Sequence, residues 1–436
     1  MKTQSIQITP EFKRALCLME KTTHHLFITG KAGSGKSTLL QLFKAHTAKN
    51  LVVLAPTGVA AVNVAGQTIH SFFKFGIDIR PEKVRRCSNP LQAEIIRQLD
   101  TILIDEVSMV RADLLDCVDR SLRLTCKSSL PFAGKQMVFF GDLFQLPPVI
   151  PPEEQLYFDH HYENGYFFSA KALRGGNLKL IELQEIHRQK EPDFISLLNH
   201  IRMNSLSESD LRRLNGRYRP DFRAGPRDLH VTLTTRNQQA RLFNHQQLQI
   251  LPETEIPFPC RVEGDFYQNS FPADEILRLK TGARVMFLNN DRENRWINGT
   301  LGQISRLEPE RDRIRVTIPR QREEVKVSPH HWDLIHYYYD IERHRIGTEV
   351  TGSFTQFPLR LAWAVTIHKS QGKTFDQVII DIGRGTFSSG QLYVALSRCT
   401  TLEGIILKEK IRKKDIFLDP RILDFLNSFQ SVSRRS

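Results

Sequence analysis

Short apolar runs alternate with more polar, helix-like segments through the first half of the chain. Each run is followed by a turn and then by a segment of helical character. This alternation is typical of strands in a parallel sheet that helices cover on both faces. The predicted strands are residues 25–29, Leu51–Ala55, Thr101–Ile104 and Gln136–Phe140. We therefore expect a first α/β lobe over residues 1–182.

The same pattern begins again after Leu183. Four apolar residues recur on one face of a helical period and predict an amphipathic helix over residues 193–203: Phe194, Leu197, Leu198 and Ile201. Further strands are predicted over residues 230–235, 359–367 and 378–382. We expect a second α/β lobe formed by residues 183–250 and 357–436.

The segment 251–356 has a different pattern. Ile314, Val316 and Ile318 alternate with polar residues, which indicates a strand with one buried face. Asn298 and Gly299 form a dipeptide that favours a tight hairpin turn. We expect a small antiparallel β unit here, inserted into the second lobe.

The net charge indicates the kind of partner that the protein binds, and the cysteine content indicates the compartment in which it is found. Lys and Arg number 61 against 48 Asp and Glu, a formal charge of +13, which favours a polyanionic partner such as nucleic acid over an inert basic enzyme. No stretch approaches the roughly 20 apolar residues that span a bilayer, and the start of the chain contains no secretory signal. The six cysteines form no C-x-x-C pair. We expect a cytoplasmic protein with reduced thiols and no membrane association.

A phosphate-binding motif follows the first predicted strand. The segment from Gly30 to Ser37 matches G-x-x-x-x-G-K-[ST] and opens a predicted helix, which excludes a chance glycine-rich turn. The backbone N–H groups of such a loop surround the β-phosphate of a nucleotide. Lys36 is expected to contact the β- and γ-phosphates of ATP, and Ser37 to ligate magnesium. The complete set of predicted nucleotide contacts in this loop is Gly30, Gly33, Gly35, Lys36, Ser37 and Thr38.

Three further residues complete a hydrolytic site. Asp105 and Glu106 end a buried strand, where Asp105 would hold magnesium and Glu106 would act as general base. An isolated acidic pair could instead cap the next helix, but its place downstream of a complete phosphate loop favours catalysis. Gln145 follows the fourth strand and is a candidate sensor of the γ-phosphate, although this segment alone could be a simple turn.

Taken together, the motifs resemble those of superfamily-one DNA helicases of the B type. Within that group the chain is similar to the PIF (petite integration frequency) family, with RecD-type helicases as relatives. The resemblance rests on residues 55–61, 68–73, 105–116, 141–148, 183–189, 366–372 and 393–398. It implies two RecA-like P-loop NTPase lobes with ATP in the cleft between them, a small SH3-like β module as the insertion, and a wedge-like insertion at about residues 72–90.

The resemblance also implies site residues in the second lobe. Arg188 and Arg398 would be arginine fingers that stabilise charge on the transferring phosphoryl group. Gln371 and Gly372 would contact the nucleotide. Either arginine could instead form an ordinary surface salt bridge, which is the usual role of a lone arginine.

DNA is the implied partner. The predicted contacts to the backbone of single-stranded DNA are Thr57, His70, Thr366, His368 and Lys369. Phe72 could stack on a base or belong to the core. The arginines of the insertion could add a basic face or be merely solvated: Arg311, Arg313, Arg315, Arg320 and Arg322. The family implies 5′-to-3′ movement by a monomer on tailed or forked duplexes, with G-quadruplexes as a further substrate.

One position departs from the family pattern, and two other functions stay open. Phe12 stands where the family often has a glutamine that reads adenine, which leaves base specificity in doubt. A P-loop kinase would need only one lobe and an acceptor pocket. A non-unwinding, ATP-regulated DNA clamp or loader would bind DNA and hydrolyse ATP without separating strands.

Overall fold

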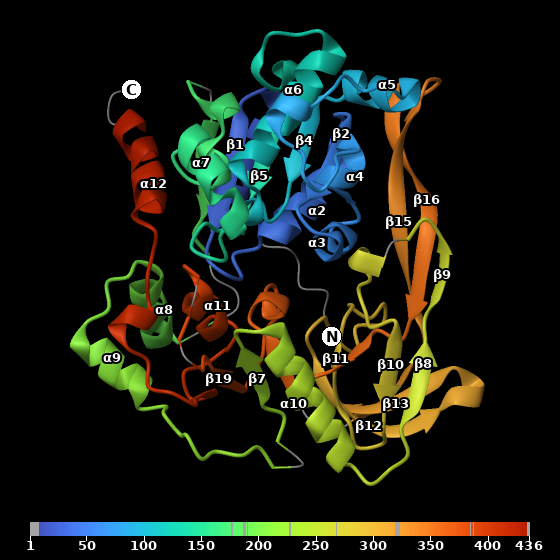
Figure 1. Cartoon of the computed structure of the whole chain (residues 1–436), viewed down its shortest axis with the longest axis vertical. Helices are drawn as coiled ribbons and strands as arrows, with labels where there is room; N and C mark the ends of the chain where they lie inside the picture. Colours follow the sequence, from blue (N-terminus) through green and yellow to red (C-terminus); the bar gives the residue numbers. More distant parts are fainter. Residues whose placement is uncertain are drawn as a thin grey trace.

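The computed structural model describes residues 8–175, 178–185, 189, 191–225, 228–266, 268–318, 323–383, 385–386 and 388–433. Two α/β lobes lie one above the other, and an antiparallel β unit flanks the lower lobe and reaches up beside the upper one (Figure 1). The upper lobe is formed by the N-terminal part of the chain. The α/β character of both lobes agrees with the alternation of apolar runs.

The first lobe contains a six-stranded parallel sheet in the order β3-β2-β4-β5-β1-β6. Its strands are β1 (His25–Gly30), β2 (Leu51–Ala55), β3 (Gln67–Thr68), β4 (Thr101–Ile104), β5 (Gln136–Phe140) and β6 (Leu178–Leu183). Its helices are α1 (Pro10–Lys21), α2 (Lys36–His46), α3 (Gly58–Asn63), α4 (Ile69–Phe73), α5 (Pro90–Gln98), α6 (Ala112–Cys126) and α7 (Gln155–His161). Leu26 and Ile28 pack in one hydrophobic cluster and Phe27 in another. Both faces of the sheet are therefore buried, which explains the unbroken apolar runs.

The second lobe contains a four-stranded parallel sheet in the order β18-β7-β19-β20. Its strands are β7 (Val231–Thr234), β18 (Ala364–Thr366), β19 (Val378–Asp381) and β20 (Ile405–Leu407). Its helices are α8 (Pro192–Arg202), α9 (Glu208–Asn215), α10 (Asn237–Ile250), α11 (Gln391–Leu396) and α12 (Pro420–Ser433). No helix within the described ranges combines the length and the apolar character needed to cross a membrane.

One predicted strand is two strands in the structure. The apolar run 359–367 contains β17 (Leu359–Leu361), which pairs with the antiparallel unit, and then β18 of the second lobe. Ala362 is fully buried between them and Trp363 nearly so. Because the chain stays in the interior while it crosses from one sheet to the other, hydrophobicity alone gives no sign of the boundary.

The antiparallel unit is built on a five-stranded sheet in the order β14-β13-β12-β11-β17. Its own strands are β11 (Arg284–Phe287), β12 (Leu301–Glu308), β13 (Arg313–Ile318) and β14 (Glu323–Val327), beside the pair β8 (Ile256–Pro259) and β10 (Ile276–Leu279). Ile314, Val316 and Ile318 face its core, as their alternation predicts. Asn298 and Gly299 do form a tight turn, across which Thr300 N–H donates to Ile297 O at 2.9 Å, but this turn ends a longer loop between β11 and β12 and does not by itself join the two strands.

A long hairpin links this unit to the first lobe. It consists of β15 (His330–Asp340) and β16 (Arg345–Gln356), with β9 (Arg261–Gly264) beside its base, and it rises along the first lobe toward α5 (Figure 1). The Tyr337 hydroxyl accepts a hydrogen bond from Val53 N–H at 2.9 Å and donates to Val53 O at 3.3 Å. Gln67 Nε2 donates to Ile335 O at 2.8 Å. The hairpin thus covers the part of β2 that the short strand β3 does not reach.

The C-terminal helix returns from the second lobe to the first. Phe425 of α12 stacks on Phe168 with ring centroids 4.3 Å apart, and its ring also contacts Phe27 and Phe167 of the first lobe. Arg421 Nη1 donates to Glu163 O at 3.3 Å. The lobes are therefore joined by the connection after β6 and again by α12.

The Tyr337 contact yields a test of the docked hairpin. We expect Tyr337→Phe to lower the opening free energy measured by hydrogen exchange at the Val53 amide by about 1–3 kcal/mol, because a buried donor and acceptor lose their partner. Tyr338→Phe is the matched control, since Tyr338 is 41% exposed and points to the other face of the strand. Equal exchange at Val53 in both variants would contradict the contact.

Candidate nucleotide and DNA site

The phosphate loop joins β1 to α2, as its motif requires. Gly35 caps α2 with φ 86° and supplies no side-chain hydrogen bond, so the first N–H groups of the helix point to the loop. At Gly30 a Cβ atom would lie 2.5 Å from Ser34 Oγ and 2.8 Å from Leu183 O, which only glycine avoids. Gly33 also has a positive φ, and Ser37 and Thr38 are exposed at the start of the helix. The loop is shaped to surround an anion.

Lys36 lies folded over this loop. Its Nζ donates to Gly30 O at 2.7 Å and to Lys31 O at 3.2 Å. Burial lowers the pKa of the Lys36 ammonium, while the carboxylates of Asp142 and Glu106 act in the opposite direction. The Lys36 ammonium group therefore lies against the phosphate loop, with carboxylates nearby. From this position it can contact a bound phosphate.

The acidic pair ends β4, opposite the phosphate loop. Asp105 Oδ1 accepts a hydrogen bond from Glu106 N–H at 2.9 Å, and Glu106 has a left-handed backbone with φ 50°. Burial raises the pKa of both carboxyls, and Asp105 adds to the effect at Glu106, whose pKa rises to about 7. A carboxylate with raised proton affinity next to a phosphate site suits a general base.

The second lobe reaches into this site through Gln371. Its Nε2 donates to Glu106 Oε2 at 3.1 Å and to Gln145 Oε1 at 3.0 Å. Gln145 in turn donates through Nε2 to Asp142 Oδ2 at 3.2 Å. The structure thus brings Gln145 and Gln371 together at the general base, although they lie more than 200 residues apart in sequence. Gly372 follows with φ 77° and is exposed.

Arg398 lies at the end of α11 and is 1% exposed. It donates to Val394 O at 2.9 Å, to Ser397 Oγ at 2.9 Å and to Lys373 O at 3.3 Å. Burial raises the pKa of Glu106, and the charge of Arg398 acts in the opposite direction. Arg188, the other predicted finger, lies outside the described residues. Its neighbour Gln189 donates to the carbonyls of Ser397 and Cys399 at 2.9 and 3.0 Å.

Arg202 lies beside Asp142 of the first lobe, although none of the sequence motifs contains it. It ends α8 of the second lobe, pairs with Asp142 at 3.3 Å, and lies over the Phe144 ring at 3.9 Å. Its charge also lowers the pKa of Lys31 in the phosphate loop. One feature of the sequence does indicate a buried role: Arg202 follows Leu198 by four residues and therefore lies on the apolar face of the predicted helix. A charged side chain on a buried face needs an oppositely charged or polar partner, and the partner here, Asp142, belongs to the other lobe.

The oxygen donors present suit magnesium. Ser37 at the start of α2 offers a hydroxyl and Asp105 after β4 offers a carboxylate, and hard cations prefer such oxygen ligands. Within the described part of the chain, no group of three or more His, Cys, Asp or Glu side chains could hold a metal ion alone. This donor set fits a cation that shares its ligands with nucleotide phosphates.

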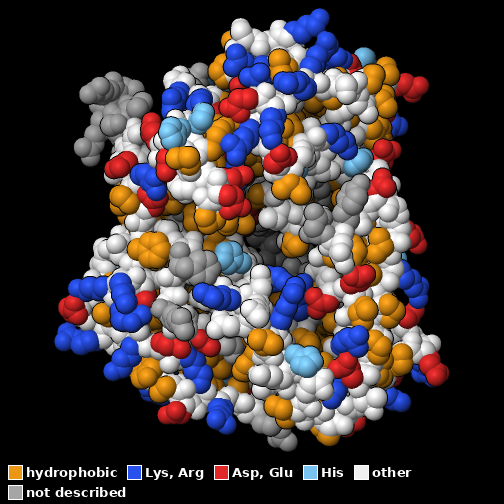
Figure 2. All heavy atoms as spheres, viewed as in Figure 1, with side chains coloured by type: hydrophobic (Ala, Val, Ile, Leu, Met, Phe, Trp, Pro, Cys, Tyr) orange, Lys and Arg blue, Asp and Glu red, His pale blue; other side chains and the backbone are white. Residues whose placement is uncertain are grey.

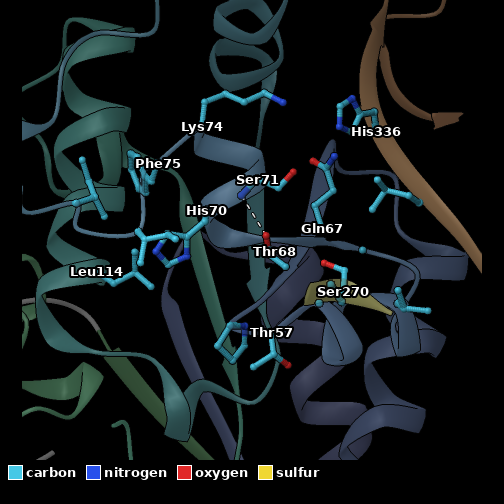
Figure 3. Close-up of a pocket in the computed structure, with 18 of the residues that line it drawn as sticks. Thr57, Gln67, Thr68, His70, Ser71, Lys74, Phe75, Leu114, Ser270 and His336 are labelled. Atoms are coloured by element: carbon cyan, nitrogen blue, oxygen red, sulfur yellow. Dashed lines mark hydrogen bonds between the residues drawn. The ribbon is translucent and has the colours of Figure 1, made fainter. Parts of the chain in front are cut away.

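A large cavity opens on the first lobe next to the predicted DNA-contacting segments. Its volume is about 1060 Å³, and its walls include Thr57, His70 and Lys74, with His336 from the hairpin and Ser270 from the insertion (Figure 3). Thr57 caps α3, accepting from Ala60 N–H at 3.3 Å. Figure 2 shows that this face of the molecule is hollowed between the two lobes, with Lys and Arg side chains along the lower rim.

A second cavity of about 580 Å³ lies on the second lobe, between α10 and β10. Thr366 and Lys369 line it together with Arg241 and Arg360. Burial lowers the pKa of Lys369, and the charges of Arg360 and Arg241 act in the same direction. His368 is half-buried beside it. Four of the predicted DNA contacts therefore line two cavities, one on each lobe: Thr57 and His70, and Thr366 and Lys369.

Phe72 is a core residue, and its predicted stacking on a base is wrong for this structure. It is 1% exposed and contacts Phe73 and Tyr337 edge to face, with ring centroids 4.9 and 6.0 Å apart. A base could reach the ring only if the docked hairpin moved. Phe12 is also buried, at 4% exposed, and its ring lies 3.0 Å from the position that a Cβ of Gly35 would occupy.

The basic cluster of the insertion is largely neutralised. Arg315 pairs with Glu308 and Glu324, each at 2.9 Å. Arg306 and Arg313 approach the same Glu308 at 3.6 and 3.9 Å. Arg320 and Arg322 lie outside the described residues. Of the predicted basic face, this leaves Arg311 exposed at the β12–β13 turn.

Comparison with known proteins supports the family resemblance and the fold. The profile of the PIF1-like helicase family matches residues 11–212, and that of the UvrD-like helicase C-terminal domain matches residues 361–404. The ATP-dependent DNA helicase Pif1 of Bdellovibrio bacteriovorus is 31% identical over an alignment 443 residues long, which covers 99% of this chain and 94% of that protein. Human ATP-dependent DNA helicase PIF1 is 33% identical over 92% of this chain, which spans 60% of the human protein.

Solved structures show the same architecture. Pif1 of Bacteroides sp in complex with ADP-AlF4 is 37% identical and superimposes with a TM-score of 0.91, with 98% of each chain covered. The same protein bound to single-stranded DNA gives a TM-score of 0.70 over the same share of both chains. The unliganded form of that protein gives a TM-score of 0.90, so the parts are arranged as in its DNA-free forms, with or without nucleotide. With two RecA-like lobes, the first of which carries the phosphate loop, this chain belongs to the PIF1-like helicase family of ATP-dependent DNA helicases.

Proposed function

We propose that this protein uses ATP hydrolysis to move 5′ to 3′ along single-stranded DNA as a monomer, and that it separates the strands of tailed or forked duplexes. The observation that carries the proposal is that the second lobe reaches the hydrolytic site of the first. Gln371 of that lobe donates to Glu106, and the charge of Arg398 opposes the rise that burial causes in the pKa of the same carboxyl. A kinase needs one lobe only and gives these two residues no role.

The residues of this chain divide the work of hydrolysis. The phosphate loop and Lys36 hold the phosphates, and Glu106 accepts the proton of the attacking water while Gln145 orients it. Magnesium held by Ser37 and Asp105 would neutralise phosphate charge. Arg398 stabilises the charge that spreads over the transferring group, and it does so only while the lobes are closed.

The proposed movement along DNA depends on the two cavities lying on different lobes. Thr57 and His70 belong to one lobe, and Thr366 and Lys369 to the other. Hydroxyl, imidazole and ammonium groups position a DNA backbone without reading its sequence. Closure around ATP and opening after hydrolysis would change the distance between the two grips on the strand. The exposed basic segment after Phe73 is the proposed wedge, with Ile77 fully exposed at its tip.

Strand separation on tailed duplexes tests this function. We expect unwinding of a duplex with a 5′ single-stranded tail and none with a 3′ tail. Lys36→Ala should abolish both ATP turnover and unwinding while DNA affinity stays nearly constant, because Lys36 contacts the loop that holds ATP and lies in neither cavity. DNA binding with ATP hydrolysis but without strand separation would identify a clamp or loader instead.

Arg398 should act on turnover rather than on nucleotide binding. We expect Arg398→Ala to lower kcat about 10³-fold or more with little change in ATP affinity, the size typical of a lost arginine finger. Arg398→Lys is the matched variant that keeps the charge but cannot reproduce the three hydrogen bonds, and it should recover only part of the rate. Equal losses of ATP affinity and kcat would exclude the finger role.

Phe12 predicts weak selection of the nucleotide base. The family glutamine offers hydrogen bonds to adenine, whereas a buried phenyl ring offers none. We expect kcat/KM for ATP and GTP to agree within about tenfold, because strong discrimination needs polar groups that the wrong base leaves unpaired. Steady-state assays with both nucleotides measure this ratio, and a strong preference for ATP would mean that another group reads the base.

A further inference from the structure

Gln371 stands between the two side chains that would handle the attacking water. Its Nε2 lies 3.1 Å from Glu106 Oε2 and 3.0 Å from Gln145 Oε1. The other end of Gln145 is also engaged, because its Nε2 donates to Asp142 Oδ2. In this arrangement both the proposed base and the proposed sensor are hydrogen-bonded to one amide group of the opposite lobe.

A hydrolytic water needs the same position. To be activated it must donate one hydrogen to the Glu106 carboxylate and can donate the other to the Gln145 carbonyl oxygen, each at about 2.6–3.2 Å. The two N–H groups of Gln371 Nε2 already make these two donations at those distances. An amide nitrogen and a water oxygen cannot occupy one point, so the amide excludes the water while it stays there.

The backbone connects Gln371 directly to the second DNA cavity. Gln371 follows the one-turn helix η9 (His368–Ser370) and donates through its own N–H to His368 O at 3.2 Å. Lys369 N–H donates to Thr366 Oγ1 at 3.4 Å, which ties together the two residues that line the cavity. Any displacement of this turn by a phosphate group in the cavity therefore moves the Gln371 backbone as well.

From this geometry we propose that Gln371 is a plug that holds the base and the sensor inactive until single-stranded DNA binds at Thr366 and Lys369. The proposal rests on the proposed function and adds its regulation. A DNA phosphate on the cavity residues shifts η9, the amide withdraws from Glu106 and Gln145, and a water takes its place between them. Glu106 then accepts a proton from that water as the water oxygen attacks the γ-phosphorus and the ADP oxygen leaves. The same residue thereby couples the strand to hydrolysis.

Gln371→Ala tests the plug through the ratio of two rates. We expect ATP hydrolysis without DNA to rise about fivefold or more, in the range of typical coupling between sites. The stimulation by DNA, which is the rate with saturating single-stranded DNA divided by the rate without it, should therefore fall. The affinity for DNA should stay unchanged, because the Gln371 side chain lies outside both cavities.

Two further variants keep the test decisive. Gln246→Ala removes an exposed glutamine of α10 and should leave both rates as in the wild type. Gln371→Ser is a second truncation too short to reach Glu106, and it should repeat the result should the alanine variant fold poorly. Thermal unfolding of each variant checks that the fold is kept.

The remaining outcomes are distinct. If Gln371→Ala lowers the rates with and without DNA by one common factor, Gln371 positions the base productively and the plug is refuted. Unchanged rates would refute it equally. If the wild-type protein shows neither stimulation by single-stranded DNA nor unwinding, the proposed function itself fails, and this result is independent of any Gln371 variant.

Discussion

The burial of two adjacent carboxylates at the end of one strand is the constraint on which the site depends. Removing Asp105 and Glu106 from water is unfavourable unless cations and hydrogen-bond donors surround them. Lys36 comes from the same lobe, but Arg398 and Gln371 come from the other. These charges are therefore balanced where the two lobes meet. A nucleotide that brings further negative charge into the cleft strengthens the need for the cations of the second lobe.

The predictable parts of the molecule are those fixed by neighbouring residues. Apolar runs located β1, β2, β4 and β5 of the first parallel sheet and β7 and β19 of the second, because burial on both faces leaves a continuous signal. The strands β3, β6 and β20 were not predicted. The phosphate loop was predicted because its glycines and its lysine all lie in one short segment, Gly30 to Ser37, so that the sequence spacing alone identifies it. The two-strand character of residues 359–367 was not found, since the segment between the strands, Ala362 and Trp363, is buried and apolar and carries no turn signal.

The parts that could not be predicted depend on contacts between distant segments. Arg202 reaches Asp142 across the cleft, and Phe72 is covered by Tyr337 from a hairpin more than 260 residues later. Neither partner is marked in the sequence near the residue it meets. The charge of Arg313 and Arg315 was correctly placed on one face of a strand, yet Glu308 and Glu324 largely neutralise it. The spacing of residues in the sequence predicts which face of a strand a side chain lies on. Only the folded structure shows which other side chains that face contacts.

The return of α12 to the first lobe has a mechanical consequence. The chain crosses between the lobes at the segment after Leu183 and again before Pro420, and the stacked rings of Phe425 and Phe168 fix the second crossing. Two lobes joined by these two chain crossings cannot slide apart, and the swing that strains neither crossing turns about the line through both. The hairpin of β15 and β16, which is docked on Val53 and Gln67, has to move with this swing. The advance along a strand in each cycle is then set by leverage: the farther a gripping group lies from this pivot, the longer the stroke that the same small angle produces.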